Sequence, residues 1–161
     1  MANTYTQCYI HLVFSPKHRA ALIRKTWADD LEKYITGIVQ GEGHKMLQIK
    51  AMPAPIHIFV GYNVSQTISK LVETIKTSSN KWVNEQGFTK QKFDWQKGYG
   101  AFSHAKMQIE TVCKYIQNQE EHHKKQTFRE EFIEILKRNE MEYEEKYLFE
   151  FFDDITDDEI G

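Results

Sequence analysis

The order of strand-like and helix-like segments along the chain restricts its fold more than any other feature. Runs rich in β-branched and aromatic residues alternate with segments whose apolar residues recur every three or four positions. The predicted elements are a strand at 5–14, a helix at 26–40, strands at 44–52 and 56–62, a helix at 65–85 and a strand at 93–103. This β-α-β-β-α-β order predicts an α+β fold, a ferredoxin-like split βαβ unit whose antiparallel sheet has helices on one face. The other face of such a sheet is left for a ligand.

Two further helices are predicted after the last strand, at 107–125 and at 128–138, because their apolar residues also have helical spacing. A chain of 161 residues suits one domain of ordinary size. We therefore predict a single domain over residues 1–150, followed by an acidic tail at 151–161.

Charge is distributed unevenly along the chain. The net charge is only -2, but residues 140–161 contain ten acids and one lysine and carry -9, so residues 1–139 carry +7. A basic body with an acidic tail is typical of a protein that binds a polyanion, with the tail screening the basic face. A solvated tail beside an otherwise neutral enzyme fits the same pattern.

Composition excludes disordered and membrane-spanning classes. Hydrophobic residues make up 40% of the chain and charged residues 27%, and no apolar run approaches the length that a bilayer requires. The polar N-terminus lacks the pattern of a signal peptide, so we expect a cytoplasmic protein. Cys8 and Cys113 lack metal-ligand spacing and are predicted to be buried free thiols.

A few polar side chains have positions that suit chemistry. At 100° per residue, Tyr115, Gln119 and His122 fall on one edge of the predicted third helix, beside its apolar stripe. His57 alternates with apolar neighbours in a strand and points to the face opposite theirs. Spacing alone favours ordinary packing roles for these side chains, and the other strand histidines, His11 among them, show no shared spacing.

Four motifs resemble, in the same order, those of the single-tyrosine transposases of insertion sequences, including the REP-associated tyrosine transposases. The motifs are His11–Pro16 (HLVFSP), Met52–Val60 (MPAPIHIFV), Gly98–Ser103 (GYGAFS) and Tyr115–His123 (YIQNQEEHH). The resemblance extends over about residues 5–150, and the last motif is the most specific.

The resemblance implies a mechanism and partners. Tyr115 is the implied nucleophile, which attacks a DNA phosphorus and leaves a 5′-phosphotyrosine and a free 3′-hydroxyl. The implied cofactor is a divalent metal, Mg or Mn, held by the two histidines of a His-hydrophobic-His motif and by Gln119. Single-stranded or hairpin DNA is the implied partner, with Lys70, Lys76 and Lys81 near its phosphates. Family members act as homodimers, so the Tyr115 helix is expected to approach His57 of a second copy.

One departure from the family motif affects the metal site. Pro55 stands where the motif has its first histidine, and Ala54 replaces the acid before it, so only His57 and Gln119 remain as matched ligands. We therefore expect a weakly bound or absent metal and impaired cleavage, which Pro55→His would improve. A DNA-binding module that no longer cleaves is the first alternative. An RNA-binding ferredoxin-like domain is the second.

Overall fold

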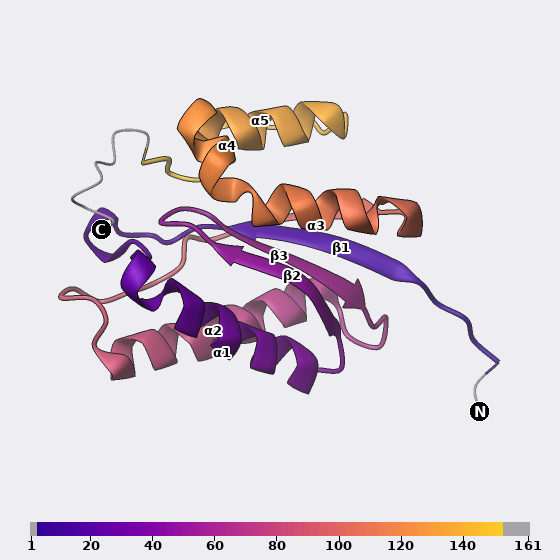
Figure 1. The fold of residues 1–161 in the computed structure, drawn as a ribbon, viewed down its shortest axis with the longest axis horizontal. Helices are drawn as coiled ribbons and strands as arrows, with labels where there is room; N and C mark the ends of the chain where they lie inside the picture. The colour runs from indigo at the N-terminus through magenta and orange to yellow at the C-terminus, as the bar shows by residue number, and fades with distance from the viewer. Residues whose placement is uncertain (1–2, 153–161) are drawn as a thin grey trace.

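A four-stranded antiparallel sheet forms the centre of the computed structural model, which describes residues 3–152 (Figure 1). The strands are β1 (Cys8–Phe14), β2 (Lys45–Ala51), β3 (Ile56–Tyr62) and β4 (Gly100–His104). Their order across the sheet is β2-β3-β1-β4, and every neighbouring pair is antiparallel. This is the predicted split βαβ arrangement, in which β3 lies between β2 and β1.

Helices cover both faces of the sheet (Figure 1). The first face carries α1 (Lys25–Gly41) and α2 (Ile68–Gln86), and the second carries α3 (Ile109–Gln117), α4 (Gln119–Lys125) and α5 (Phe128–Arg138). Short 3-10 turns occur at Arg19–Ala21, Lys106–Gln108 and Glu145–Tyr147. The predicted fold class is confirmed, but the second face is not left open, because α3 packs on β2 and β3.

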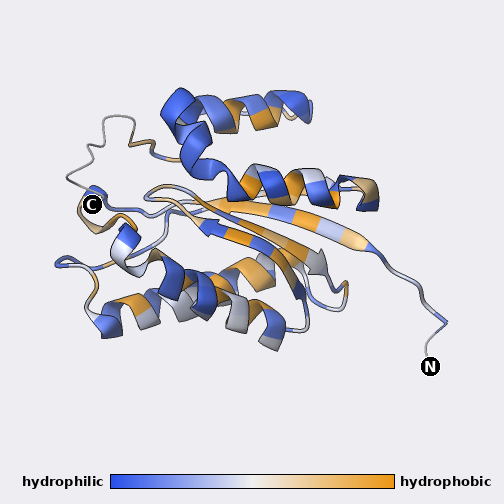
Figure 2. Ribbon diagram, viewed as in Figure 1, coloured by the Kyte–Doolittle hydropathy of each residue, from blue (hydrophilic) through white to orange (hydrophobic). Residues whose placement is uncertain are grey.

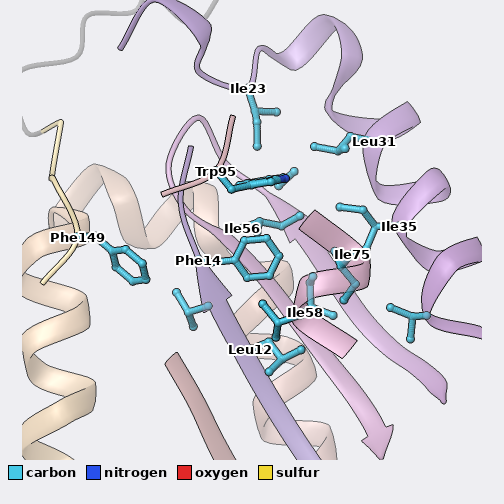
Figure 3. Packing of buried hydrophobic residues seen from close by; sticks show 14 of the residues in the cluster. Leu12, Phe14, Ile23, Leu31, Ile35, Ile56, Ile58, Ile75, Trp95 and Phe149 are labelled. Carbon is cyan, nitrogen blue, oxygen red and sulfur yellow. The ribbon is translucent and has the colours of Figure 1, made fainter. Parts of the chain in front are cut away.

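Successive side chains of each strand point to opposite faces of the sheet and therefore form two layers. Leu12 and Phe14 of β1 and Ile56 and Ile58 of β3 point toward α1 and α2 and form the main apolar core (Figure 3). The outer surfaces of these two helices are hydrophilic (Figure 2). Phe59 points the other way and packs with Val112 and Ile116 of α3. The odd-numbered positions of β1 and β3 therefore face α3, and these include His11 and His57.

Two predicted elements, the strand at 93–103 and the helix at 107–125, differ most from the structure. Residues 93–99 form a loop and only Gly100–His104 is a strand, because Gly98 adopts a left-handed φ of +84° and Trp95 anchors the loop. The indole Nε1 of Trp95 donates to Ser79 Oγ at 2.9 Å. The predicted helix 107–125 is divided at Asn118, whose φ of -91° and ψ of 20° depart from helical values. This break changes the direction of the chain and brings α4 and α5 back toward the sheet.

The structure also bears on two expectations from the sequence, the absence of a membrane-spanning helix and the burial of the two cysteines. Within residues 3–152, no helix is long and apolar enough to cross a membrane. Cys8 and Cys113 are free thiols, but they are only partly buried, because Cys8 begins β1 and Cys113 lies at the edge of the cluster that α3 forms with Phe59. Most of the predicted acidic tail, residues 153–161, lies outside the described residues.

Candidate functional site

Two histidine rings meet on the face of the sheet under α3. His11 of β1 and His57 of β3 are diagonal neighbours in the register, because His11 pairs with Phe59. Their rings stack with centroids 5.1 Å apart, and His11 Nε2 lies 2.8 Å from His57 Nδ1. Burial, together with the neighbouring His57 and His104 rings, lowers the pKa of His11 well below its ordinary value. His11 is therefore neutral beside a fully buried His57.

The Glu131 carboxylate of α5 reaches the same place from the opposite side. Its Oε1 atom lies 3.2 Å from His57 Nε2 and 3.7 Å from His123 Nε2 of α4. Its Oε2 atom accepts a hydrogen bond from the Tyr115 hydroxyl at 2.5 Å. Glu131 is only 3% exposed, so this carboxylate is a buried centre to which β3, α3 and α4 all contribute.

Glu131 is ionised in these surroundings. Burial on its own would raise the pKa of the carboxyl group, but polar interactions with His123, His57 and the Tyr115 hydroxyl outweigh it. The net effect holds the pKa of Glu131 well below its usual range. A carboxylate that stays charged inside the protein can accept hydrogen bonds or hold a cation.

Tyr115 is protonated in the described state. Its ring stands edge-on to that of His57, with centroids 6.0 Å apart. Burial, the charge of Glu131 and the hydrogen bond to Glu131 all raise the pKa of the Tyr115 hydroxyl far above its ordinary value. The phenol must therefore lose its proton to become a nucleophile, and Glu131 is in contact with it.

The motifs also single out Gln119 and Pro55, and the surroundings of these two residues differ from each other. Gln119 begins α4 and is fully buried; its Nε2 lies 3.4 Å from the Tyr115 carbonyl oxygen, while its Oε1 has no hydrogen-bond partner. Pro55 immediately precedes β3, is buried, and contributes only its carbonyl oxygen, which accepts from the Met52 amide. Pro55 thus offers no side-chain donor, as the sequence indicated.

Three donor atoms in this centre form a group that could hold a metal ion. His57, His123 and Glu131 each present one ligand atom, and these atoms lie within 4.8 Å of one another. Among the described residues, His57 Nε2, His123 Nε2 and Glu131 Oε1 are all buried without a well-directed hydrogen bond. Buried polar atoms are normally satisfied, so an additional partner fits between them.

Two residues of this centre were not identified from the sequence: His11 and Glu131. His11 was treated as an ordinary surface or strand histidine, but it is buried against His57, because both side chains occupy the same face of adjacent strands. Glu131 did carry a signal. It lies within the apolar stripe of α5, between Phe128 and Phe132, where an acid would be costly without a partner.

The lysines predicted to meet DNA phosphates lie on α2, across the sheet from Tyr115 (Figure 1). Lys70 and Lys81 have exposed side chains and are ion-paired on the helix surface, with Glu73 and Glu85 respectively. Lys76 is different, because its ammonium group donates to the carbonyl oxygens of Gln96 and Gly98 at 2.8 and 2.7 Å. Burial lowers the pKa of Lys76 to about 8, although the charge of Asp94 acts in the opposite direction.

We predict that Lys76→Met destabilises the fold. Two carbonyl oxygens of the 93–99 loop would lose their donor, which costs about 1 to 3 kcal/mol. The midpoint of thermal unfolding should fall by several degrees, as measured by circular dichroism. Lys81→Met is the matched control, since its side chain is 79% exposed, and it should leave the midpoint nearly unchanged. Equal midpoints for the two variants would contradict a structural role for Lys76.

Two cavities open toward the centre from different sides. One, of about 550 Å³, lies between β4, α3 and α5 and is lined by Tyr115, His11, His104 and Arg138 among others. The other, of about 450 Å³, is lined by His123, Lys50 and Lys124 among others. Tyr115 and His123 are therefore each reached from solvent, although Glu131 and His57 between them are buried.

Comparison with known proteins identifies a family and its fold. The family model described as "Transposase IS200 like" matches residues 4–119. A protein from Deinococcus radiodurans R1 that is provisionally assigned as a transposase superposes with a TM-score of 0.60 at 20% identity, over 74% of this chain and 95% of that one. The structure of the REP-associated tyrosine transposase bound to a REP hairpin gives 0.56 at 13% identity, over 76% of this chain and 73% of that one. No curated protein matches the sequence.

Proposed function

Because the chain belongs to the IS200-like transposase family, we propose that it binds single-stranded, hairpin-forming DNA and cleaves and rejoins it through Tyr115. The observation that carries the proposal is the contact between the Tyr115 hydroxyl and the Glu131 carboxylate, beside the buried His57. A nucleophilic hydroxyl held in a fixed orientation by a buried hydrogen bond is one requirement of covalent catalysis.

The residues of the chain have separate parts in this reaction. Glu131 Oε2 orients the Tyr115 hydroxyl through its hydrogen bond, and the phenolic proton ends on the leaving 3′-oxygen as the phenolic oxygen bonds to the scissile phosphorus. The new bond joins Tyr115 to the 5′-phosphate, and the bond to the 3′-oxygen breaks, which leaves a free 3′-hydroxyl. Reversal of these steps with another 3′-hydroxyl rejoins the strand without an external energy source.

A divalent metal, which the family implies, fits the donors that the motifs supply. His57 Nε2 and Gln119 Oε1 are both buried without a hydrogen-bond partner, as expected of ligand atoms. A bound Mg or Mn ion would polarise the scissile phosphate and stabilise charge on its oxygens. Because Pro55 provides no donor, these two neutral ligands would hold the ion weakly by themselves, and we expect slow cleavage if no other residue contributes.

A DNA-binding module that does not cleave is the second candidate. It is favoured by the raised pKa of Tyr115, since the phenol is hard to ionise in its described surroundings. In this case the chain would still bind hairpin DNA with the same affinity, but it would form no covalent bond to the DNA. The two candidates therefore predict the same binding curve and differ only in the formation of a protein-DNA bond.

The test uses an end-labelled DNA hairpin with single-stranded flanks, incubated with the full chain and Mn²⁺ or Mg²⁺. The account predicts tighter binding to this DNA than to a duplex or an RNA hairpin of the same sequence. Affinity should fall at least about tenfold between 50 and 200 mM salt, since the basic body displaces counterions. A labelled band that survives denaturing electrophoresis is the predicted covalent product. Preference for the RNA hairpin would instead favour the RNA-binding alternative.

We further propose that the active form is a homodimer in which each chain contributes a complete set of site residues. Tyr115, His57 and Glu131 are already in contact within one chain, in contrast to the expectation that Tyr115 approaches His57 of the partner. Mixing Tyr115→Phe with His57→Ala protein should therefore restore no cleavage. Recovery of about a quarter or more of the unaltered activity on mixing would contradict a site formed within one chain.

A further inference from the structure

The Glu131 carboxylate and two histidine rings form a buried centre that lacks a partner. Glu131 is 3% exposed and His57 is fully buried, so their facing atoms have no access to bulk water. Oε1 of Glu131 lies within ion-pair distance of both rings, yet neither ring N–H is directed at it. Unsatisfied buried polar atoms are costly, and three of them facing one another indicate a missing group that all three can bind.

Two of the distances between these atoms match those between neighbouring ligands of a metal ion. Ligands at about 2.1 Å from a tetrahedrally coordinated ion lie about 3.4 Å from one another. His57 Nε2 and His123 Nε2 are 3.2 and 3.7 Å from Glu131 Oε1, and the three residues each offer one ligand atom within 4.8 Å of those of the other two. Two imidazoles and one carboxylate are donors typical of Mn²⁺, Zn²⁺ and related divalent transition metals.

The surroundings of His57 have a second feature of metal-binding histidines. A metal-ligating imidazole usually donates its other ring N–H to a neighbouring polar group, which fixes its orientation. His57 Nδ1 lies 2.8 Å from His11 Nε2. When His57 Nδ1–H donates to His11 Nε2, the lone pair of His57 Nε2 points toward Glu131. The negative charge of the carboxylate would repel this lone pair in the absence of a cation.

We propose that His57 Nε2, His123 Nε2 and Glu131 Oε1 form a binding site for a divalent transition-metal cation, which replaces the donor lost at Pro55. His123 ends the last motif but is not one of its matched ligand positions, and Glu131 lies beyond the residues that the family model matches, so both add to His57 and Gln119. Glu131 Oε2 holds the Tyr115 hydroxyl, so one carboxylate positions both the cation and the nucleophile. A role for this cation in DNA cleavage rests on the proposed function, whereas binding of the cation does not.

A cation has a route to this site. His123 is 17% exposed, and it lines the cavity of about 450 Å³ that also contains Lys50, Lys124 and Glu120. Glu120 pairs with Lys50 at 3.3 Å, so the rim of this cavity is not uniformly positive. The ion can enter past His123 without opening the sheet.

The experiment is a titration of Mn²⁺ into the full chain, followed by the electron paramagnetic resonance signal of free Mn²⁺. We expect one equivalent to bind to the unaltered protein. Glu131→Gln and His123→Gln should each weaken the affinity at least about tenfold. Glu130→Gln alters the adjacent acid of the same helix, and it should leave the affinity within about twofold.

Either of two results would overturn the inference: no Mn²⁺ bound by the unaltered protein at millimolar concentration, or equal affinities for Glu131→Gln and Glu130→Gln. His123→Gln keeps the test valid if Glu131→Gln does not fold, since His123 is partly exposed. Covalent attachment to the DNA hairpin is measured in parallel. Mn²⁺ binding without attachment would refute the proposed function alone, whereas attachment with a Glu131-independent affinity would refute only this site.

Discussion

Tyr115→Phe is expected to abolish the covalent product between protein and DNA, lowering its rate of formation at least about 1000-fold. The substitution removes the nucleophilic oxygen and keeps the ring that packs beside His57. Glu131 loses only one of its polar partners, so the fold should persist. The rate is measured by denaturing electrophoresis of end-labelled hairpin DNA in the presence of Mn²⁺.

The matched control for this variant is Tyr147→Phe. Tyr147 is 77% exposed and lies in the 3-10 turn after α5, away from the buried carboxylate. Its loss of a hydroxyl should leave the rate within about twofold of the unaltered protein. Hairpin affinity should be the same for all three proteins, which separates chemistry from binding. Equal rates for Tyr115→Phe and Tyr147→Phe would show that another side chain attacks the DNA.

Phe14→Ala is expected to lower the free energy of unfolding by about 3 to 5 kcal/mol. Phe14 is fully buried at the end of β1, and its ring stands edge-on to that of Trp95, with centroids 4.8 Å apart (Figure 3). The cavity left by the ring cannot be filled easily, because Ile56 and Trp95 are held by the sheet and by Ser79. Urea denaturation followed by tryptophan fluorescence measures the change.

Val64→Ala serves as the comparison for Phe14→Ala. Val64 is 50% exposed in the turn before α2, so its truncation should change the free energy of unfolding by less than about 0.5 kcal/mol. A loss below about 1 kcal/mol for Phe14→Ala would mean that the core between β1 and the α1-α2 layer is not packed as described.

The sheet could be predicted because its strands and turns are encoded locally. The strands predicted at 44–52 and 56–62 pair as β2 and β3 around the Pro53-Ala54-Pro55 turn, and α5 begins and ends at the predicted residues. The break at Asn118 could not be predicted, since Asn118 sits in an otherwise continuous helical pattern. That break is decided by the packing of α4 and α5 against the second face of the sheet.

The candidate site was only partly visible in the sequence, for the same reason. Tyr115, Gln119 and His57 were identified because they match motif positions to which the family resemblance assigns a role. His11 and Glu131 depend on contacts between elements far apart in the chain, His11 through the sheet register and Glu131 through the return of α5. The periodicity of apolar residues indicates which face of its own helix or strand a residue occupies. It does not indicate which other element packs against that face.

The most direct test of the central claim is to locate the DNA attachment point on the unaltered protein. The hairpin DNA is incubated with the full chain and Mn²⁺, the protein is digested, and the nucleotide-bearing peptide is identified by mass spectrometry. The account predicts a single modified peptide in which the 5′-phosphate of the DNA is bonded to Tyr115, with a free 3′-hydroxyl on the released strand. Attachment at a different residue, or hairpin binding with no attached peptide, would contradict it.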